Sequence, residues 1–203
     1  MGLDDIMILN YDSKTFQVKI VYYGPAMSGK TTSIKFLFSH FKKEDSVKSI
    51  DSTVGRTLFF DFGVLHFQGT EWGIKFLIYS ATGQDFYAST RPATLNGVDG
   101  LIFVVDSQIK FLKHNIRSWK ELKTLFGAEF YNIPIVISLN KSDLIMDENQ
   151  ENNKFLSYIE YNRFRKISIQ ATAAIKGQGV LKSFSELIKF IFPQLSINLC
   201  ISN

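Results

Sequence analysis

Residues 24–31 read GPAMSGKT, and this short stretch limits the folds open to the chain more than any other. It fits the pattern G-x-x-x-x-G-K-[ST], whose backbone N–H groups surround phosphates when the loop joins a strand to a helix. Residues 15–23, directly before it, alternate apolar and polar side chains as a strand does, and residues 32–43, directly after it, have apolar side chains at helical spacing. Because strand, loop and helix coincide, the stretch predicts a nucleotide-phosphate site rather than an ordinary glycine turn.

The side chains of this loop predict how the phosphates are held. The ammonium group of Lys30 is expected to reach the β- and γ-phosphates, and the hydroxyl of Thr31 is expected to bind Mg²⁺. Backbone N–H groups and the start of the following helix add positive potential. The nucleotide-binding residues expected in this region are Gly24, Ala26, Met27, Ser28, Gly29, Lys30, Thr31 and Thr32.

Length and composition narrow the class of protein. A chain of 203 residues suits one domain, which we expect to span residues 1–203. The single cysteine, Cys200, fits a reducing compartment, and neither a secretory signal nor a bilayer-length apolar run is visible, so we expect a cytoplasmic location. The net charge of +4 comes without a dense Lys/Arg run, so no nucleic-acid partner is expected. Residues 200–203 lack the aliphatic pattern of a prenylation box, so no stable membrane anchor is expected.

The rest of the chain alternates strand and helix patterns. Strands are expected at residues 15–23, 57–67, 73–80, 100–106, 133–139 and 165–170, with the second and third forming a hairpin. Helices are expected at residues 32–43, 113–126, 151–161 and 178–192, and loops at 42–56 and 81–96. This order predicts an α/β fold with a mostly parallel six-stranded sheet and helices on both faces. Ligands of such sheets bind at the carboxyl ends of the strands.

The tetrapeptide NKSD at residues 140–143 indicates the base. It fits N-K-x-D, in which the carboxylate of Asp143 can accept hydrogen bonds from guanine N1–H and the 2-amino group, a pair that adenine does not offer. Asn140 can bond the purine edge and the neighbouring loop, and the stem of Lys141 can lie on the base. A kinase or ATPase that shares only the phosphate loop is therefore disfavoured. A weaker signal follows the last strand, where small residues let backbone N–H groups approach the guanine oxygen: Ala171, Thr172 and Ala173.

Two further stretches are candidates for contacts with the γ-phosphate. The N–H of Gly83 can bond the γ-phosphate, and the adjacent Gln84 can orient the attacking water. Thr53, four residues before the strand that starts at residue 57, is a second candidate ligand of Mg²⁺, although Ser52 competes for that role. The alternative for each is an ordinary polar loop residue.

Several stretches together resemble the MglA-like small GTPases, prokaryotic members of the Ras-like superfamily. They include the phosphate loop and its strand, the run RTLFFDF, the run GQDFY and the pair GVDG and VVDS, at residues 19–32, 56–62, 83–87, 97–100 and 104–107. The resemblance covers roughly the whole chain, and the run TLFFDF after the first switch is distinctive of that group.

The resemblance implies a small G domain of the P-loop GTPase fold and a switch operated by GTP and GDP with Mg²⁺. It implies roles in cell polarity, motility or trafficking-type processes, an effector that the sequence does not identify, and stimulation by dimeric Roadblock-fold proteins. It also aligns Arg56 with an arginine that acts as a cis finger in some relatives. A surface salt bridge is the slightly favoured alternative for that residue.

The sequence departs from the family pattern at three places. Ser80 stands where most Ras-like GTPases have an aspartate that holds Mg²⁺ through water, although a hydroxyl is common in the MglA-like group. Ala26 replaces a glycine, and its methyl group crowds the space needed by Gln84 or an arginine. The guanine loop has Ala171-Thr172-Ala173 in place of the usual serine and alanine, a variant that the group tolerates. Slow hydrolysis is expected, and the alternative is a nucleotide-bound pseudo-GTPase that acts as an interaction module.

Overall fold

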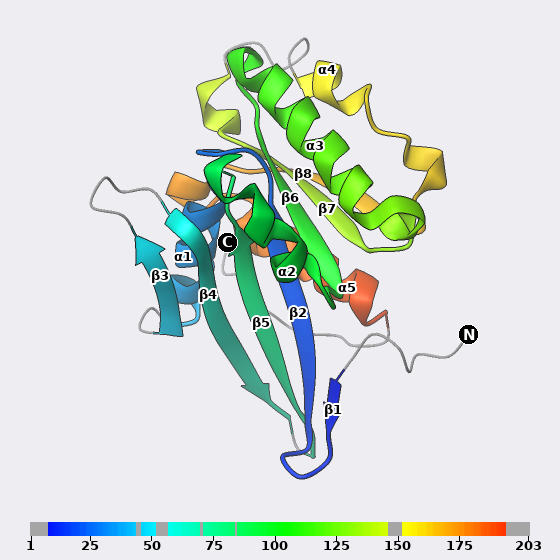
Figure 1. Ribbon diagram of the computed structural model, residues 1–203. Coiled ribbons are helices and arrows are strands. Elements are labelled where there is room, and N and C mark those ends of the chain that lie inside the picture. Colours follow the sequence, from blue (N-terminus) through cyan, green and yellow to red (C-terminus); the bar gives the residue numbers. More distant parts are fainter. Residues whose placement is uncertain are drawn as a thin grey trace.

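The computed structural model describes residues 8–43, 46–51, 57–69, 71–83, 85–145 and 152–193. One twisted sheet runs through this part of the chain (Figure 1). Its order is β3-β4-β5-β2-β6-β7-β8, with β1 paired to β2. The strands are β1 (Ile8–Asn10), β2 (Thr15–Tyr23), β3 (Val47–Asp51), β4 (Thr57–Gln68), β5 (Gly73–Ala81), β6 (Gly100–Asp106), β7 (Ile135–Asn140) and β8 (Ile167–Ala171).

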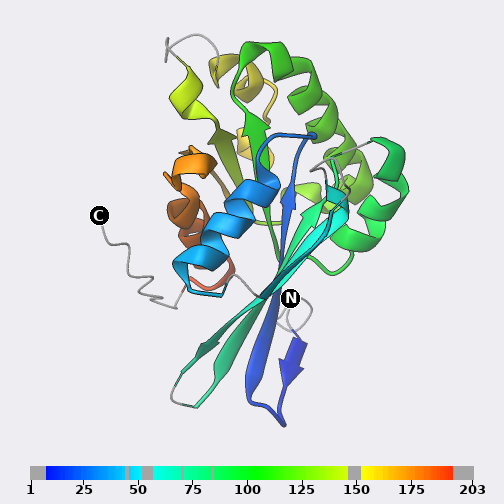
Figure 2. The same ribbon diagram turned by 90° about the vertical axis from the view of Figure 1, so that its left-hand side faces the viewer.

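Helices cover both faces of the sheet (Figure 2). They are α1 (Lys30–His40), α2 (Arg91–Leu95), α3 (Leu112–Phe126), α4 (Asn152–Leu156) and α5 (Val180–Ile191). Helices α1 and α5 contribute to one hydrophobic core, and α2, α3 and α4 contribute to the other. Among the described residues, no helix has the length and apolar character needed to cross a membrane.

The central strands send alternate side chains into the two cores, which explains their continuous apolar sequences. In β6, Ile102 and Val104 pack on the α1–α5 side, whereas Leu101, Phe103 and Val105 pack on the α3 side. A strand buried on both faces needs apolar residues at every position, so the alternation typical of a half-exposed strand disappears.

Four parallel pairings join β5, β2, β6, β7 and β8, and the pairings of β1, β3 and β4 are antiparallel. The expected α/β fold, its mostly parallel sheet and the β4–β5 hairpin are confirmed. The expected count of six strands is wrong, because the sheet has eight. The two additional strands are β1, which is only three residues long, and β3, an edge strand with the polar sequence VKSID. Short polar edge strands give little periodic signal.

The expected loops also contain regular structure. Residues 81–96 include a 3₁₀ helix over Asp85–Thr90 that leads directly into α2. The sequence hides α2 because it is five residues long and has Pro92 in its first turn. The first helix begins at Lys30, two residues earlier than expected, and ends at His40, shortly before Lys42 takes a left-handed φ of 54°.

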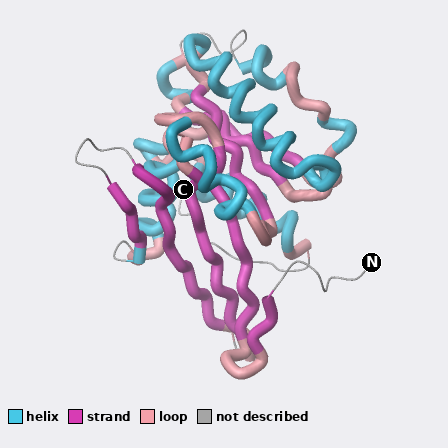
Figure 3. The backbone as a smooth tube through the Cα atoms, in the orientation of Figure 1, coloured by secondary structure: helices cyan, strands magenta, loops and turns pink. Residues whose placement is uncertain are grey.

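The β1–β2 and β4–β5 hairpins continue beyond the helices at the end of the sheet opposite the phosphate loop (Figure 3). At their tip the ring of Trp72 contacts the rings of Tyr11 and Phe16, with centroids 6.0 and 5.0 Å away. The carboxyl ends of the parallel strands lie at the other, helix-covered end of the sheet, where the loops that carry the candidate site residues come together.

Candidate functional site

Two glycines shape the loop between β2 and α1. Gly24 has φ 141° and Gly29 has φ 105°, values that side chains rarely allow. A Cβ atom on Gly24 would lie 2.2 Å from the carbonyl oxygen of Val104, and one on Gly29 would lie 2.1 Å from Nδ2 of Asn140. The loop therefore requires glycine at both positions, for backbone conformation and for space.

Lys30 begins α1 with its side chain turned into the loop. Its residue is 6% exposed, and Nζ donates hydrogen bonds to the carbonyl oxygens of Gly24, at 2.9 Å, and Pro25, at 2.7 Å. A buried ammonium group requires such acceptors. The cation thus lies inside the concave backbone that the motif predicted for phosphates.

Asn140, the last residue of β7, joins two loops. It is 2% exposed, its Nδ2 donates to the carbonyl oxygen of Ser28 at 2.7 Å, and its Oδ1 accepts from the backbone N of Ala174 at 2.9 Å. Oδ1 also accepts from the hydroxyl of Thr172 at 3.2 Å. The structure therefore brings the phosphate loop, the NKSD segment and the loop after β8 into one site.

The backbone N–H groups after β8 are already engaged. Those of Thr172, Ala173 and Ala174 donate to Leu139 O, Gln178 O and Asn140 Oδ1 at 2.9, 3.0 and 2.9 Å. A guanine oxygen placed against this loop would share these donors. The arrangement makes the loop rigid, because each donor holds a neighbouring segment.

Lys141 and Asp143 each have a partner that sequence reasoning missed. Lys141 has a left-handed φ of 62°, and its Nζ lies 2.6 Å from Oδ2 of Asp106, which is 3% exposed. Asp143 has a side chain 14% exposed, with Oδ2 3.0 Å from Nζ of Lys176. Asp106 pairs in register with Asn140 across β6 and β7. Both residues end a buried strand, and this shared position in the sequence could have predicted that Asp106 lies near Lys141.

Gly83 lies directly against the phosphate loop. A Cβ atom at this position would lie 2.3 Å from the backbone N of Ala26 and 2.5 Å from the carbonyl carbon of Pro25. Ser80, at the end of β5, is 1% exposed and pairs with Tyr22. The candidates Ser52, Thr53, Arg56 and Gln84 lie outside the described residues.

The candidate ligands of Mg²⁺ in this protein are side-chain hydroxyl groups. Thr31 lies in the first turn of α1, directly after Lys30, and its oxygen is a ligand type that suits Mg²⁺ when phosphates supply the remaining donors. Within the described ranges, no group of three or more His, Cys, Asp or Glu side chains could hold a metal ion. The hydroxyl of Thr31 thus fits a metal ion that is held partly by the protein and partly by the phosphates of a bound nucleotide.

A family comparison decides the class. The model of the ADP-ribosylation factor (Arf) family matches residues 6–191. The chain belongs to the Arf family of small GTPases. MglA, the mutual gliding-motility protein of Myxococcus xanthus, is 35% identical over 195 residues, which are 92% of this chain and 96% of that protein. The resemblance to MglA-like GTPases of the Ras-like superfamily is thereby confirmed.

Other small GTPases are also similar. ADP-ribosylation factor-like protein 3 of Caenorhabditis elegans is 30% identical over 186 residues, 89% of this chain and 91% of that protein. The Arl6 (BBS3) small GTPase from Trypanosoma brucei, solved with the nucleotide analogue GppNp, matches 88% of this chain and 99% of its own with a TM-score of 0.62 and 20% identity. This structural match supports the P-loop GTPase fold. Because the protein is a member of this family of small GTPases, it binds GTP.

Proposed function

We propose that this GTPase is a molecular switch that binds GTP and GDP with Mg²⁺ and hydrolyses GTP slowly. The observation that carries the proposal is the position of Asn140, whose side chain joins Ser28 in the phosphate loop to Ala174 after β8. One buried amide thus fixes the phosphate region relative to the base region. A ligand with a purine at one end and a triphosphate at the other requires such a fixed separation.

Base recognition is assigned to the NKSD segment. In this proposal Asp143 accepts hydrogen bonds from guanine. Its ion-pair partner Lys176 has a side chain that is 56% exposed, so burial does not fix the position of that side chain. The stem of Lys141 lies on the base, while Ala171, Thr172 and Ala173 border the guanine oxygen. Guanine is favoured over adenine because adenine would leave the Asp143 carboxylate without donors.

Phosphate and metal binding are assigned to the loop and to α1. Lys30 binds the β- and γ-phosphates, and Thr31 holds Mg²⁺ with Thr53, or with Ser52 in its place. When bound, Mg²⁺ neutralises developing charge on the phosphate oxygens. Gly83 donates its N–H to the γ-phosphate, Gln84 orients the attacking water, and Arg56 is the second candidate for a group that stabilises the transferred charge.

Slow turnover is supported by the crowding around Ala26. The backbone of Gly83 leaves no room for even one further carbon atom between itself and residues 25–26. The Cα atom of Ala26 would itself lie 2.6 Å from a Cβ atom on Gly83, so the alanine that replaces a glycine stands in a crowded part of the loop. Ser80 carries no charge with which to hold a water of the Mg²⁺ shell, which is a second reason to expect a low rate.

A Roadblock-fold dimer is the partner proposed for stimulation. The support is the resemblance to MglA-like GTPases together with the 35% identity to MglA of Myxococcus xanthus. Cell polarity, motility or trafficking-type regulation is the corresponding process. A cytoplasmic location is proposed with it.

The first experiment is to identify the nucleotide that copurifies with the protein and then to measure single-turnover phosphate release with and without a Roadblock-fold dimer. Bound GDP or GTP and slow release that the dimer accelerates are expected. Guanine nucleotide without phosphate release in either condition would instead establish the pseudo-GTPase alternative. ATP binding that excess GDP does not displace would contradict both.

The variant Gln84→Leu tests the assigned water position. It should slow single-turnover hydrolysis by at least about tenfold, because a leucine cannot orient water, and it should leave GDP affinity unchanged. The parallel variant Arg56→Ala separates the two candidates. An unaltered rate in Gln84→Leu would move the assignment to Arg56.

A further inference from the structure

Arg91, the first residue of α2, is a buried cation outside the nucleotide-binding motifs. The residue is 4% exposed, and its Nε donates a hydrogen bond to the carbonyl oxygen of Thr82 at 2.9 Å. Its guanidinium group also forms an ion pair with Glu121 of α3. A buried guanidinium group requires acceptors of this kind, so the contacts with Thr82 and Glu121 fix the position of the Arg91 side chain.

The acceptor Thr82 is directly connected to the segment that contacts the phosphate loop. Thr82 is 4% exposed and precedes Gly83, on which a Cβ atom would lie 2.3 Å from the backbone N of Ala26. Because a single planar peptide unit joins Thr82 to Gly83, a displacement of Thr82 would move Gly83 relative to the loop. The hydrogen bond from Arg91 therefore holds one end of the stretch that contains Gly83 and Gln84.

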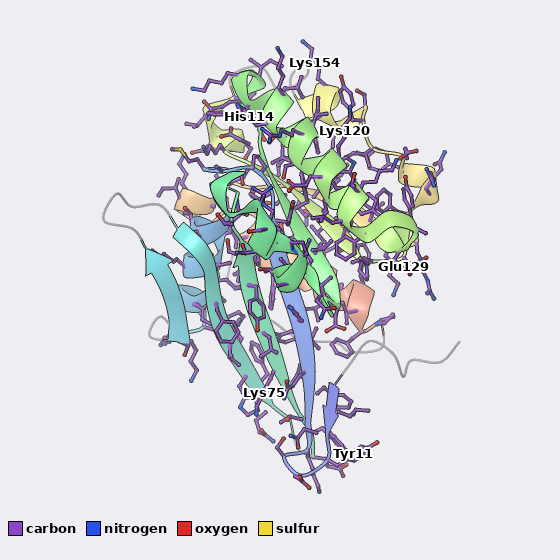
Figure 4. The ribbon with its side chains drawn as sticks, in the orientation of Figure 1. Tyr11, Lys75, His114, Lys120, Glu129 and Lys154 are labelled. Carbon is purple, nitrogen blue, oxygen red and sulfur yellow. The ribbon has the colours of Figure 1, made fainter. Side chains whose placement is uncertain are left out.

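Helix α3 gives the guanidinium group a firm support. The helix is 15 residues long, and the side chains of Trp119 and Leu122, on either side of Glu121, are buried in the core. Figure 4 shows His114 near the beginning of α3 and Lys120, the residue before Glu121, further along it. The carboxylate that pairs with the guanidinium group thus projects from a part of the helix that the core holds in place.

The ion pair also lies close to Tyr23, the last residue of β2. Burial and the charge of Glu121 raise the pKa of the Tyr23 phenol, and the charge of Arg91 opposes this shift. The ring of Tyr23 stacks on the ring of Phe103, with centroids 6.4 Å apart. Because Tyr23 directly precedes Gly24, the ion pair adjoins the strand that leads into the phosphate loop as well as the segment after β5.

We infer, on the basis of the proposed function, that Arg91 is a positioning residue that holds the N–H of Gly83 at the γ-phosphate. GDP lacks this phosphate, so Arg91 contributes to the affinity for a triphosphate and to hydrolysis, and not to the affinity for GDP. The alternative is a structural ion pair that fastens α2 to α3, in which the hydrogen bond to Thr82 has no part.

Two substitutions separate these roles, because each retains a different half of the arginine. Arg91→Lys keeps a cation for Glu121 and places a methylene group where arginine has Nε. Arg91→Gln loses the cation and places its Nε2 donor at the position of the arginine Nε. The matched control is Arg163→Lys, because Arg163 has a side chain 56% exposed and pairs with Glu160 at the surface.

The test compares the dissociation constants of GDP and of GppNp, a GTP analogue that is not hydrolysed, by isothermal titration in the presence of Mg²⁺. Arg91→Lys is expected to bind GppNp at least about tenfold more weakly, with unchanged GDP affinity, because the hydrogen bond to the charged γ-phosphate is misplaced. Its single-turnover hydrolysis of GTP should also be at least about tenfold slower. Arg91→Gln should retain more of both properties than Arg91→Lys, and Arg163→Lys should match the wild type.

The inference would be overturned by unchanged GppNp affinity in Arg91→Lys, by an equal loss of GDP and GppNp affinity, or by a greater loss in Arg91→Gln than in Arg91→Lys. Partial unfolding would weaken both nucleotides equally, so the ratio of the two constants reports on position rather than on stability. A wild type that binds both nucleotides without releasing phosphate would contradict only the proposed hydrolysis, since the ratio needs no turnover. A wild type that binds neither would contradict the proposed function, and this inference with it.

Discussion

At the scale of single residues, Asp106 is the side chain that links β6 to the NKSD segment. Its Oδ2 lies 2.6 Å from Nζ of Lys141, and its Oδ1 accepts hydrogen bonds from N and Nε2 of Gln108, both at 3.1 Å. Asn115 holds the backbone of Asp106 through two further hydrogen bonds. Asp106 is thus a positioning residue that fixes the direction of the Lys141 side chain.

The variant Asp106→Asn keeps the size of this side chain and removes its charge. We expect GDP to dissociate about tenfold faster, because the ion pair with Lys141 becomes a hydrogen bond from the ammonium group to a neutral amide oxygen. Stopped-flow measurement with a fluorescent GDP analogue gives the rate. Glu160→Gln, which breaks the exposed ion pairs with Lys123 and Arg163 elsewhere, is the matched control. Equal rates in the two variants would contradict the positioning role.

The variant Asp143→Asn tests base recognition at the same scale. An amide cannot accept both guanine donors, so GTP affinity should fall by at least about tenfold and xanthosine nucleotides should bind better than guanosine nucleotides. Isothermal titration with both nucleotides measures the change. Lys176→Gln removes only the exposed partner of Asp143 and should have little effect. A wild-type affinity for GTP in Asp143→Asn would exclude the base-reading role.

At the scale of elements, the junction before β6 is tied to β2 by a buried carboxylate. Asp99 is 4% exposed, its Oδ2 accepts from the backbone N of Lys19 at 2.7 Å, and its Oδ1 has no hydrogen-bond partner. Burial raises the pKa of Asp99 to about 6, although the hydrogen bond and the charge of Lys19 oppose the shift. The unfolded chain, with an ordinary pKa, loses this proton at lower pH.

The folded protein therefore binds the Asp99 proton more tightly than the unfolded chain does. Its contribution to stability is present below the ordinary pKa of 3.8 and is lost as pH rises toward about 6. Asp99→Asn should increase the free energy of unfolding at neutral pH, by at most about 3 kcal/mol, and should reduce the pH dependence between these values. Urea denaturation at a series of pH values measures both. An unchanged slope in the variant would contradict the assignment.

At the scale of the whole molecule, the features that could be predicted are those governed by burial on both faces. The strand expected at residues 100–106 has the bounds of β6, because every residue of this strand is buried. β3 was missed because a polar edge strand depends on pairing with β4, which the local sequence does not reveal. The same reason applies to the site. Asn140 belongs to a motif, whereas Asp106 and Lys176 act from neighbouring elements, and only the assembled sheet brings them close.

The inward position of Lys30 has a consequence for the stability of its loop. Its ammonium group is held by two carbonyl oxygens of its own loop, so the backbone that surrounds the cation also supplies its acceptors. Without these contacts the cation would be an unpaired buried charge, whose desolvation costs several kcal/mol. The shape of the loop and the position of its cation therefore stabilise each other, and a substitution that alters either one is expected to disturb both.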